Sequence, residues 1–248
     1  MAAKKIKEFR GFSGNTIHLM KKGDQLFVRK LGHVQRNCSR MALLRSQGFP
    51  VPELFYQGER RLDMQYLHGM DMRTYLLTHE VNPLMEFLEH TFEQLNTGAE
   101  PKDYTDAYMA KLAHTDFTDI PFERTELLKR LPKILPQTNY HGDLTLENIM
   151  WTEDGGFHLI DCADSQWDSF IFDLSKLRQD LRFGWFLRHN PANINSRLMR
   201  MQKRLLRRYP QAADDHILIL MLLRVHRYTQ PNTMERKFIL DAIDDLWK

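Results

Sequence analysis

Residues 141–148 read His-Gly-Asp-Leu-Thr-Leu-Glu-Asn, and a later Leu-Ile-Asp triplet ends at Asp161. Between them, the short apolar runs 149–151 and 157–160 are separated by Glu-Asp-Gly-Gly, which is strong turn chemistry. The pattern predicts a tight hairpin, with Asn148 just before its first strand and Asp161 just after its second. The oxygen atoms of both side chains are then expected at the same end of the hairpin.

The three polar residues of this segment suit one kind of chemistry. Asp143 can accept the proton of an attacking hydroxyl group, while Asn148 and Asp161 offer hard oxygen ligands to Mg²⁺ on the phosphates of a nucleotide. Metal-assisted phosphoryl transfer needs this set of groups. The alternative interpretation is an ordinary surface hairpin with acidic ends, which would not require the His-Gly-Asp start.

The segment resembles the catalytic core of the aminoglycoside phosphotransferase and choline kinase group of small-molecule kinases, which have a protein-kinase-like fold. This group carries His-Gly-Asp-x-x-x-x-Asn followed by Ile-Asp. Gly142, and Cys162-Ala163 after the second Asp, are similar to the small-molecule branch rather than to protein kinases. The resemblance also implies that Asp173 is a buried structural carboxylate that starts a helix or anchors a loop.

This resemblance implies an α+β, bilobal protein-kinase-like fold. A small antiparallel β-sheet lobe that binds nucleotide is expected over residues 1–65. A larger, mainly helical lobe that carries the catalytic hairpin and the acceptor site is expected over residues 66–248, the two forming one kinase-like domain. A chain of 248 residues with 42% hydrophobic content has ample material for such a core.

The first lobe contains a candidate phosphate-binding loop and a candidate phosphate-binding lysine. Gly11, Ser13 and Gly14 lie in a small-residue stretch between two β-prone segments, where backbone N–H groups and the serine hydroxyl can approach phosphate oxygens. The stretch resembles the short Gly-x-Ser-Gly loops of the family, although a plain hairpin turn has the same composition. Lys30 ends the predicted strand 25–30 and, by resemblance, occupies the place of the lysine that holds the nucleotide phosphates.

The segment from Leu62 to Asp71 resembles the connection between the lobes of these kinases, whose backbone edge binds a purine base. Gln65 and Leu67 are therefore candidate nucleotide-binding residues through their backbone groups. A simple strand-to-helix loop would differ little in sequence.

One departure from the family pattern concerns the helix predicted over residues 34–47, which Gly48 and Pro50 end. The family places a Glu there to pair with the strand lysine, yet no Asp or Glu occurs between Lys30 and Glu53. We expect another group to position Lys30, such as Gln35, Gln47 or a carboxylate from elsewhere. The departure also supports a pseudokinase hypothesis.

Apolar positions at helical spacing predict helices over 84–95 and 104–112, a less regular one over 127–135, and further helices after residue 174. The region 174–248 holds fifteen Lys or Arg against seven Asp or Glu, and many of the basic residues lie between 197 and 208. This Arg-rich segment is either a solvated helix face or a surface for an anionic acceptor or a membrane. It has no recognition motif that favours nucleic acid.

Other features of the sequence narrow the class of protein. Two cysteines suit a reducing cytoplasm rather than a disulfide framework, and no secretory signal or spanning segment is visible. The eleven histidines lack metal-ligand spacing. Peripheral membrane contact stays open.

The resulting hypothesis is a transferase, with Mg²⁺ as cofactor, that moves the γ-phosphoryl group of ATP or GTP to a hydroxyl of a small molecule. The acceptor is left open between a sugar, an anionic saccharide intermediate, an amino alcohol, an aminoglycoside and a lipid head group. The first alternative is a nucleotide-binding pseudokinase or partner-binding scaffold without turnover. A protein kinase is disfavoured because no long activation loop follows Asp161.

Overall fold

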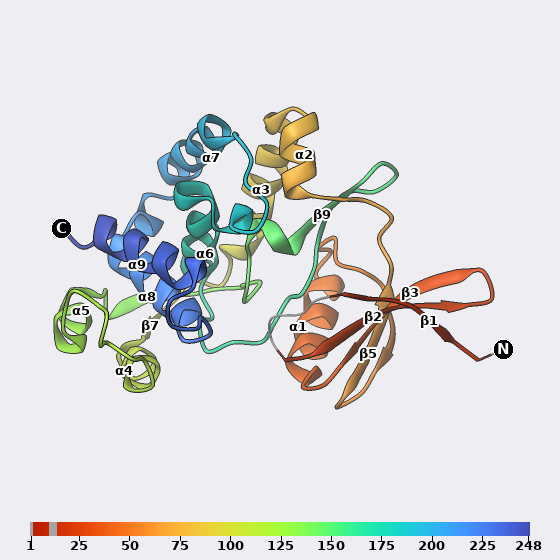
Figure 1. Ribbon diagram of the computed structural model, residues 1–248, viewed down its shortest axis with the longest axis horizontal. Helices are drawn as coiled ribbons and strands as arrows, with labels where there is room; N and C mark the ends of the chain where they lie inside the picture. Colours follow the sequence, from red (N-terminus) through yellow and green to blue (C-terminus); the bar gives the residue numbers. More distant parts are fainter. Residues whose placement is uncertain (1, 10–13) are drawn as a thin grey trace. The chain divides into compact units, whose positions relative to one another are not determined.

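A computed structural model describes residues 2–9 and 14–248 (Figure 1). The chain forms two compact units, Met1–Tyr75 with Glu147–Ser165, and Leu76–Leu146 with Gln166–Lys248. The hairpin segment groups with the N-terminal part of the chain in this division. The physical reason is pairing: strand β6 (Met70–Asp71) bonds to the first strand of the hairpin.

The first unit is built on an antiparallel sheet of five strands in the order β1-β2-β3-β5-β4 (Figure 1). Its strands are β1 (Lys4–Phe9), β2 (Thr16–Lys22), β3 (Gln25–Leu31), β4 (Leu54–Gln57) and β5 (Arg61–Gln65). The β3–β5 register puts Lys30 opposite Leu62 and Arg29 opposite Asp63. Because side chains alternate along a strand, Lys30 and Arg29 point to opposite faces of the sheet, as predicted.

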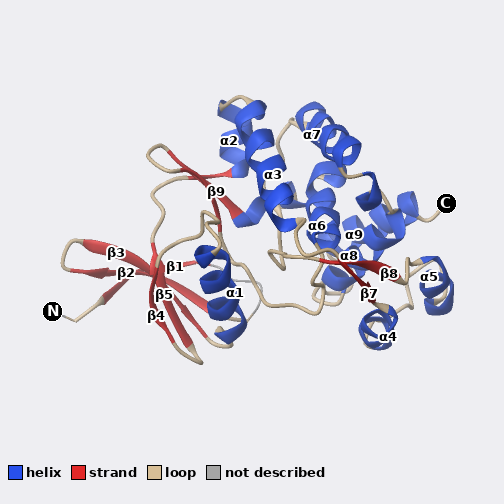
Figure 2. Ribbon diagram, turned by 180° about the vertical axis from the view of Figure 1, so that it is seen from behind, coloured by secondary structure: helices blue, strands red, loops and turns tan. Residues whose placement is uncertain are grey.

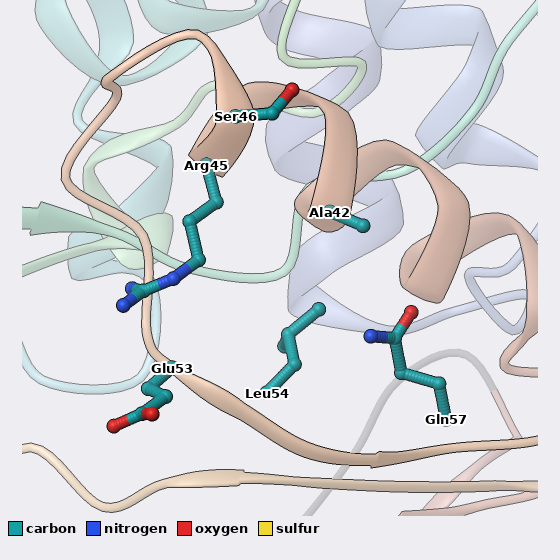
Figure 3. Close-up of a pocket in the computed structure, with 6 residues that line it drawn as sticks. All are labelled: Ala42, Arg45, Ser46, Glu53, Leu54 and Gln57. Atoms are coloured by element: carbon teal, nitrogen blue, oxygen red, sulfur yellow. The ribbon is translucent and has the colours of Figure 1, made fainter.

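Helix α1 (Gln35–Ser46) connects β3 to β4 and agrees with the predicted range 34–47 within one residue at each end. It ends where Gly48 adopts a φ of +85°, a left-handed conformation that glycine reaches without steric cost. A shallow hollow separates the end of α1 from β4 (Figure 3). None of the predicted site residues lines this hollow, and Arg45 there bonds the carbonyl of Val51 at 3.1 Å.

The predicted hairpin forms from β9 (Ile149–Thr152) and β10 (Gly156–Leu159). Ile149 lies opposite Leu159, and the Ile160 N–H donates to the carbonyl of Asn148 at 2.9 Å. Asn148 therefore directly precedes one strand and Asp161 closely follows the other at the same end of the hairpin, as the sequence pattern predicts.

The second unit is mainly helical (Figure 2). Its helices are α3 (Val81–Leu95), α4 (Thr105–Ala113), α5 (Arg124–Arg130), α6 (Phe170–Phe183), α7 (Asn195–Arg208), α8 (Asp215–His226) and α9 (Met234–Leu246), while α2 (Met72–Thr78) runs across the boundary between the units. No helix among the described residues is long and apolar enough to cross a membrane.

The sequence missed a small sheet of the second unit, in which β7 (Glu100–Asp103) pairs with β8 (Ile134–Gln137). The expected helix over 127–135 was wrong in its second half. Pro132 cannot continue a helix, so α5 ends at Arg130 and the chain from Ile134 extends along β7. Tertiary pairing decides the conformation here, and the apolar spacing alone does not reveal it.

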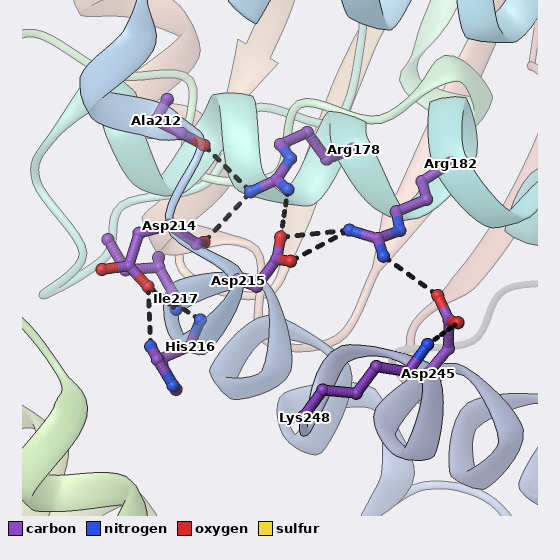
Figure 4. A network of polar contacts seen from close by, with 9 residues as sticks. All are labelled: Arg178, Arg182, Ala212, Asp214, Asp215, His216, Ile217, Asp245 and Lys248. Carbon is purple, nitrogen blue, oxygen red and sulfur yellow. Dashed lines mark hydrogen bonds and ion pairs between the residues drawn. The ribbon is translucent and has the colours of Figure 1, made fainter.

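Helices α6 and α8 form the centre of the helical unit and are buried along most of their lengths. Arg178 of α6 donates to the carbonyls of Ala212 and Asp214 and to the Asp215 carboxylate (Figure 4). Arg182, one turn further on, joins Asp215 to Asp245 of α9. These arginines fasten α6 to the start of α8 and to α9, so α6 is a rigid base for the loops that precede it.

Candidate functional site

The first unit brings Lys30 and Asp161 together. Lys30 is 3% exposed and its ammonium group donates to Oδ1 of Asp161 at 2.5 Å. Asn37 of α1 donates to the same oxygen at 2.9 Å and to the carbonyl of Cys162, also at 2.9 Å. The buried lysine and the amide thus hold one oxygen of the carboxylate from two elements of the unit.

The other oxygen of Asp161 is the one suited to a cation. None of the described residues donates a hydrogen bond to Oδ2, and the side chain is 40% exposed. Asp161 also has a φ of +55°, a left-handed conformation that a residue other than glycine seldom adopts. Within the described part of the chain, no group of three or more His, Cys, Asp or Glu gathers to enclose a metal ion. An open carboxylate oxygen with Asn148 at the same hairpin end fits Mg²⁺, which takes few protein ligands and completes its shell with phosphates and water.

Asn37 is a residue of the candidate site that the sequence did not single out. The sequence predicted that Gln35, Gln47 or a distant carboxylate would position Lys30, and the carboxylate is that of Asp161. The α1 helix contains no acidic residue, and the neutral amide of Asn37 bonds the Asp161 carboxylate rather than the lysine. Asn37 lies near the start of α1, where a partner for Lys30 was expected. The sequence pattern did not point to it because its side chain carries no charge.

The structure describes only some of the other residues that are predicted to bind the nucleotide. Gly11 and Ser13 lie outside the described residues, while Gly14 has a φ of +75°, which only glycine adopts readily. Gln65 ends β5 and exchanges hydrogen bonds with the backbone of Glu53. The backbone N–H and C=O of Leu67 bond to no described residue, so they are available to a ligand such as a purine base.

In the second unit, the loop that carries Asp143 is held by the buried carboxylate of Asp173. The backbone N–H groups of His141 and Gly142 donate to it at 2.5 and 3.0 Å, and that of Leu144 donates at 3.4 Å. Asp173 lies in the first turn of α6 and has no exposed surface. The interpretation of Asp173 as a loop-anchoring carboxylate is confirmed.

Two further buried groups from α6 fix the same loop. Lys176 donates to the carbonyl of Gly142. Gly142 has a φ of +93°, a backbone conformation that glycine adopts without the steric cost that a side chain would add. Asp180 accepts the N–H of Leu146 at 2.7 Å. Three residues of α6, Asp173, Lys176 and Asp180, therefore bond the backbone on both sides of Asp143, which orients that carboxylate.

Asp143 itself is partly exposed and accepts a hydrogen bond from Arg224 of α8 at 2.7 Å. Burial raises the pKa of Asp143, but the nearby charges of Arg224, Lys176 and His141 outweigh it, so the pKa lies below its ordinary value. The carboxylate is consequently ionised at neutral pH and able to accept a proton. The sequence did not single out Arg224.

The Arg-rich segment of α7 is largely used in packing. Arg204 forms a two-pronged bond to Glu89 of α3, at 2.7 and 2.6 Å, and Arg208 pairs with Glu93. Arg197 donates to the carbonyls of Leu76 and His79. The remaining basic residues of the segment, Arg200, Lys203 and Arg207, are exposed. This segment is mostly a helix–helix interface with a solvated outer face.

A β-sheet unit with a buried lysine paired to a carboxylate, and a helical unit with an anchored His-Gly-Asp loop, define the class of protein-kinase-like phosphotransferases. The sequence profile of the phosphotransferase enzyme family, APH, matches residues 30–213, and the chain belongs to this family. No curated protein sequence matches the chain significantly.

Solved structures show the same fold at low sequence identity. The aminoglycoside phosphotransferase APH(4)-Ia is 11% identical, with a TM-score of 0.69 over 99% of this chain and 93% of that one. A putative fructosamine-3-kinase from Haemophilus somnus 129PT is 13% identical, with a TM-score of 0.62 over 100% and 92%. LicA, solved in complex with AMP, is 15% identical, with a TM-score of 0.56 over 98% and 93%. The fold is bilobal and protein-kinase-like, and the protein is a small-molecule phosphotransferase.

Proposed function

We propose that the protein transfers the γ-phosphoryl group of ATP, or of GTP, to a hydroxyl of a small molecule such as a sugar or an anionic saccharide intermediate. The observation that carries this proposal is the buried Lys30 bonded to Asp161, with the second carboxylate oxygen left open. Membership of the phosphotransferase family supports it. A variant of APH(4)-Ia solved with ADP and hygromycin B illustrates a nucleotide and a small-molecule acceptor bound to one protein of this fold.

The first unit would bind the nucleotide. Lys30, with the loop that contains Gly11, Ser13 and Gly14, would hold the phosphates, and the backbone of Gln65 and Leu67 would bind the base. Asn148 and Asp161 would hold Mg²⁺, which neutralises charge that develops on the phosphates during transfer.

The second unit would prepare the acceptor. Asp143 would accept the hydroxyl proton as the oxygen attacks the γ-phosphorus, and the bond from that phosphorus to the β–γ bridging oxygen would break. The nucleoside diphosphate leaves with the electron pair of that bond. The buried bonds from Asp173 and Lys176 to the loop keep Asp143 in place, so little reorganisation is needed at the moment of transfer.

A nucleotide-binding pseudokinase without turnover is the second candidate. The observation that favours it is that α1 contains no acidic residue and meets Asp161 through the neutral amide of Asn37. In this case the Lys30–Asp161 pair would serve binding alone, and the Asp143 loop would be a scaffold.

Thermal melting with ATP and GTP, with and without Mg²⁺, tests the nucleotide site first. A ligand that binds only the native state raises the melting temperature by mass action. We expect an increase that requires Mg²⁺ and disappears in Asp161→Asn. Absence of any increase in the wild type would contradict the nucleotide site.

Product analysis then separates the two candidates. In a panel of sugars, amino alcohols and aminoglycosides, formation of a phosphorylated acceptor that is lost in Asp143→Asn supports the kinase. Nucleotide binding without transfer to any acceptor, and without slow hydrolysis, favours the pseudokinase.

A further inference from the structure

Helix α7 presents two different faces, and the helix packs against α3 and α6. Its buried residues recur at spacings of three and four positions: Leu198, Met201 and Leu205. Exposed residues recur at similar spacings on the opposite side of the helix: Met199, Arg200, Lys203 and Arg207. These four residues are termed the basic face. The helix thus uses one side for packing and offers the other to the surroundings.

The cations of α7 are treated differently according to the side on which they lie. Arg204 and Arg208, which point toward α3, pair with Glu89 and Glu93. The three cations of the basic face form no ion pair or hydrogen bond with any residue that the structure describes. The acidic residues of α3 that bond to α7 are therefore used inside the helix–helix interface, and the outward charges stay uncompensated.

The chain around α7 supplies no acidic residue to balance these charges. Residues 181–213 contain no Asp or Glu. An ordinary solvated surface mixes both signs of charge, whereas a patch of one sign produces a field that attracts counter-charged partners over about a Debye length. The basic face is such a patch, and the partner that fits it is anionic.

Met199 and the shape of the face narrow the kind of partner. Met199 is 67% exposed, one turn before Lys203 on the same side of the helix. The outer side of a helix is convex and offers no groove for a peptide. A bilayer surface is flat, attracts basic side chains to its anionic head groups and takes up apolar side chains at the acyl boundary. An acidic peptide or a nucleic acid would leave Met199 in water.

We propose that the basic face of α7 binds the surface of an anionic lipid bilayer, with the three cations at the head groups and Met199 at the acyl boundary. The helix lies flat on the bilayer because its other side is packed within the helical unit. None of the residues proposed for phosphoryl transfer belongs to this face, so the two proposals stand independently. Each basic side chain near an anionic surface strengthens binding by about fivefold, and three together by on the order of a hundredfold.

Sedimentation with lipid vesicles tests the binding. One set of vesicles is phosphatidylcholine, and the other contains equal parts of phosphatidylcholine and phosphatidylglycerol. We expect the wild-type protein to bind the anionic vesicles on the order of a hundredfold more tightly than the neutral ones. The binding should weaken as NaCl is added, because salt screens the charges.

Two triple variants with the same change of charge locate the binding. Arg200→Gln with Lys203→Gln and Arg207→Gln should weaken binding to anionic vesicles by on the order of a hundredfold. The matched control replaces three exposed lysines outside α7 by glutamine: Lys129, Lys133 and Lys237. Its affinity should stay within about threefold of the wild type, because charges further from the bilayer than the Debye length are screened. Circular dichroism and urea unfolding verify that both variants fold, and the wild-type comparison needs neither.

A fluorescent label at position 199 tests the orientation of the helix. The two natural cysteines, Cys38 and Cys162, are buried, so an introduced surface cysteine is labelled selectively. Met199→Cys carrying a polarity-sensitive fluorophore should shift its emission to shorter wavelength on anionic vesicles. The same label in Lys237→Cys, on the exposed side of α9, should not shift.

The proposal is overturned if neutral and anionic vesicles bind equally, if the control triple variant loses as much affinity as the α7 variant, or if the label at position 199 keeps its emission. Binding of polyglutamate or an oligonucleotide without binding of vesicles would assign the face to an acidic protein or a nucleic acid instead. None of these measurements contains ATP, GTP or Mg²⁺. Failure of nucleotide binding in the melting experiment therefore contradicts the proposed function alone, and failure here contradicts only the bilayer contact.

Discussion

The two carboxylates at the centre of the proposed chemistry, Asp161 in the sheet unit and Asp143 in the helical unit, are positioned in opposite ways. Asp161 is held by its own side chain, through one oxygen that accepts from Lys30 and Asn37. Asp143 is held through the backbone around it, which buried groups of α6 bond on both sides. Each carboxylate also bonds directly to one cation, a buried lysine in the first case and a partly exposed arginine in the second.

This difference follows from what each carboxylate would have to do. A metal ligand needs one oxygen fixed and another open to the ion, and a direct side-chain grip provides this. A general base must be oriented while its oxygen atoms stay accessible to a substrate proton, so the support is better placed on the backbone.

Replacement of either carboxylate tests this comparison, and we expect it to have the largest effect on phosphoryl transfer. Asp143→Asn and Asp161→Asn should each lower Mg²⁺-dependent phosphoryl transfer by about 10³-fold, the scale of losing a base or a charge-stabilising group. Asp143→Asn should keep the Mg²⁺-dependent melting increase with nucleotide, and Asp161→Asn should lose it. Urea unfolding is the control, since a large loss of stability in Asp161→Asn would point to a structural role instead.

Removal of the buried support of the Asp143 loop should lower the stability of the protein and not only the rate of transfer. Asp173→Ala leaves Lys176 buried without its carboxylate partner at 3.6 Å and leaves backbone donors unpaired. We expect a loss of about 3–5 kcal/mol in the free energy of unfolding. Urea denaturation of Asp173→Ala and of Asp173→Ala with Lys176→Met measures it, and the second change should recover part of the loss. A loss below about 1 kcal/mol in the single variant would contradict the anchoring role.

On the sheet side, Asn37→Leu removes only one of the two donors to Asp161. The expected result is a nucleotide affinity weaker by about tenfold, the effect of one hydrogen bond to a charged group. Titration of the nucleotide at saturating Mg²⁺ measures it, and Ser39→Ala on the exposed face of α1 is a matched control. Unchanged affinity in Asn37→Leu would mean that Lys30 alone positions the carboxylate.

The arginine bonded to Asp143 gives a pH-dependent prediction. Arg224 is the main charge that lowers the pKa of Asp143, so Arg224→Gln should raise that pKa. Because the base must be ionised, activity falls as pH decreases through this pKa, and the acidic limb of the kcat/KM profile should move to higher pH. The same sign applies to stability: the contribution of the Arg224–Asp143 pair is present above the unfolded pKa and is lost as pH falls through the folded one. An acidic limb that stays in place in Arg224→Gln would exclude Asp143 as the titrating base.

The sequence predicted the parts of the site that lie within one short segment. The hairpin, the positions of Asn148 and Asp161 at one end of it, and Lys30 on its strand follow from local patterns of turn residues and alternation, whereas the anchoring Asp173 was expected from the resemblance to the kinase family. The roles of Asp143, Asn148 and the nucleotide-binding residues stay predictions.

The contacts that the sequence did not reveal join elements that are far apart in the chain. Asn37 meets Asp161 across 124 positions and Arg224 meets Asp143 across 81, and neither helix carries a motif at the contact. The β7–β8 pair was missed for the same reason, since two short segments become strands only by pairing with each other. A pattern of residue types within one segment holds no information about such partners.

The smallest effect should come from the part of the sequence that looked most distinctive, the Arg-rich helix α7. Arg208 and Glu93 are both exposed, and a pair in that setting contributes about 0–1 kcal/mol. Arg208→Met should therefore change the free energy of unfolding by less than about 1 kcal/mol and leave phosphoryl transfer unchanged. Urea unfolding and the transfer assay measure the two quantities side by side. A loss of stability well above this range in Arg208→Met would contradict the description of α7 as a helix with a solvated outer face.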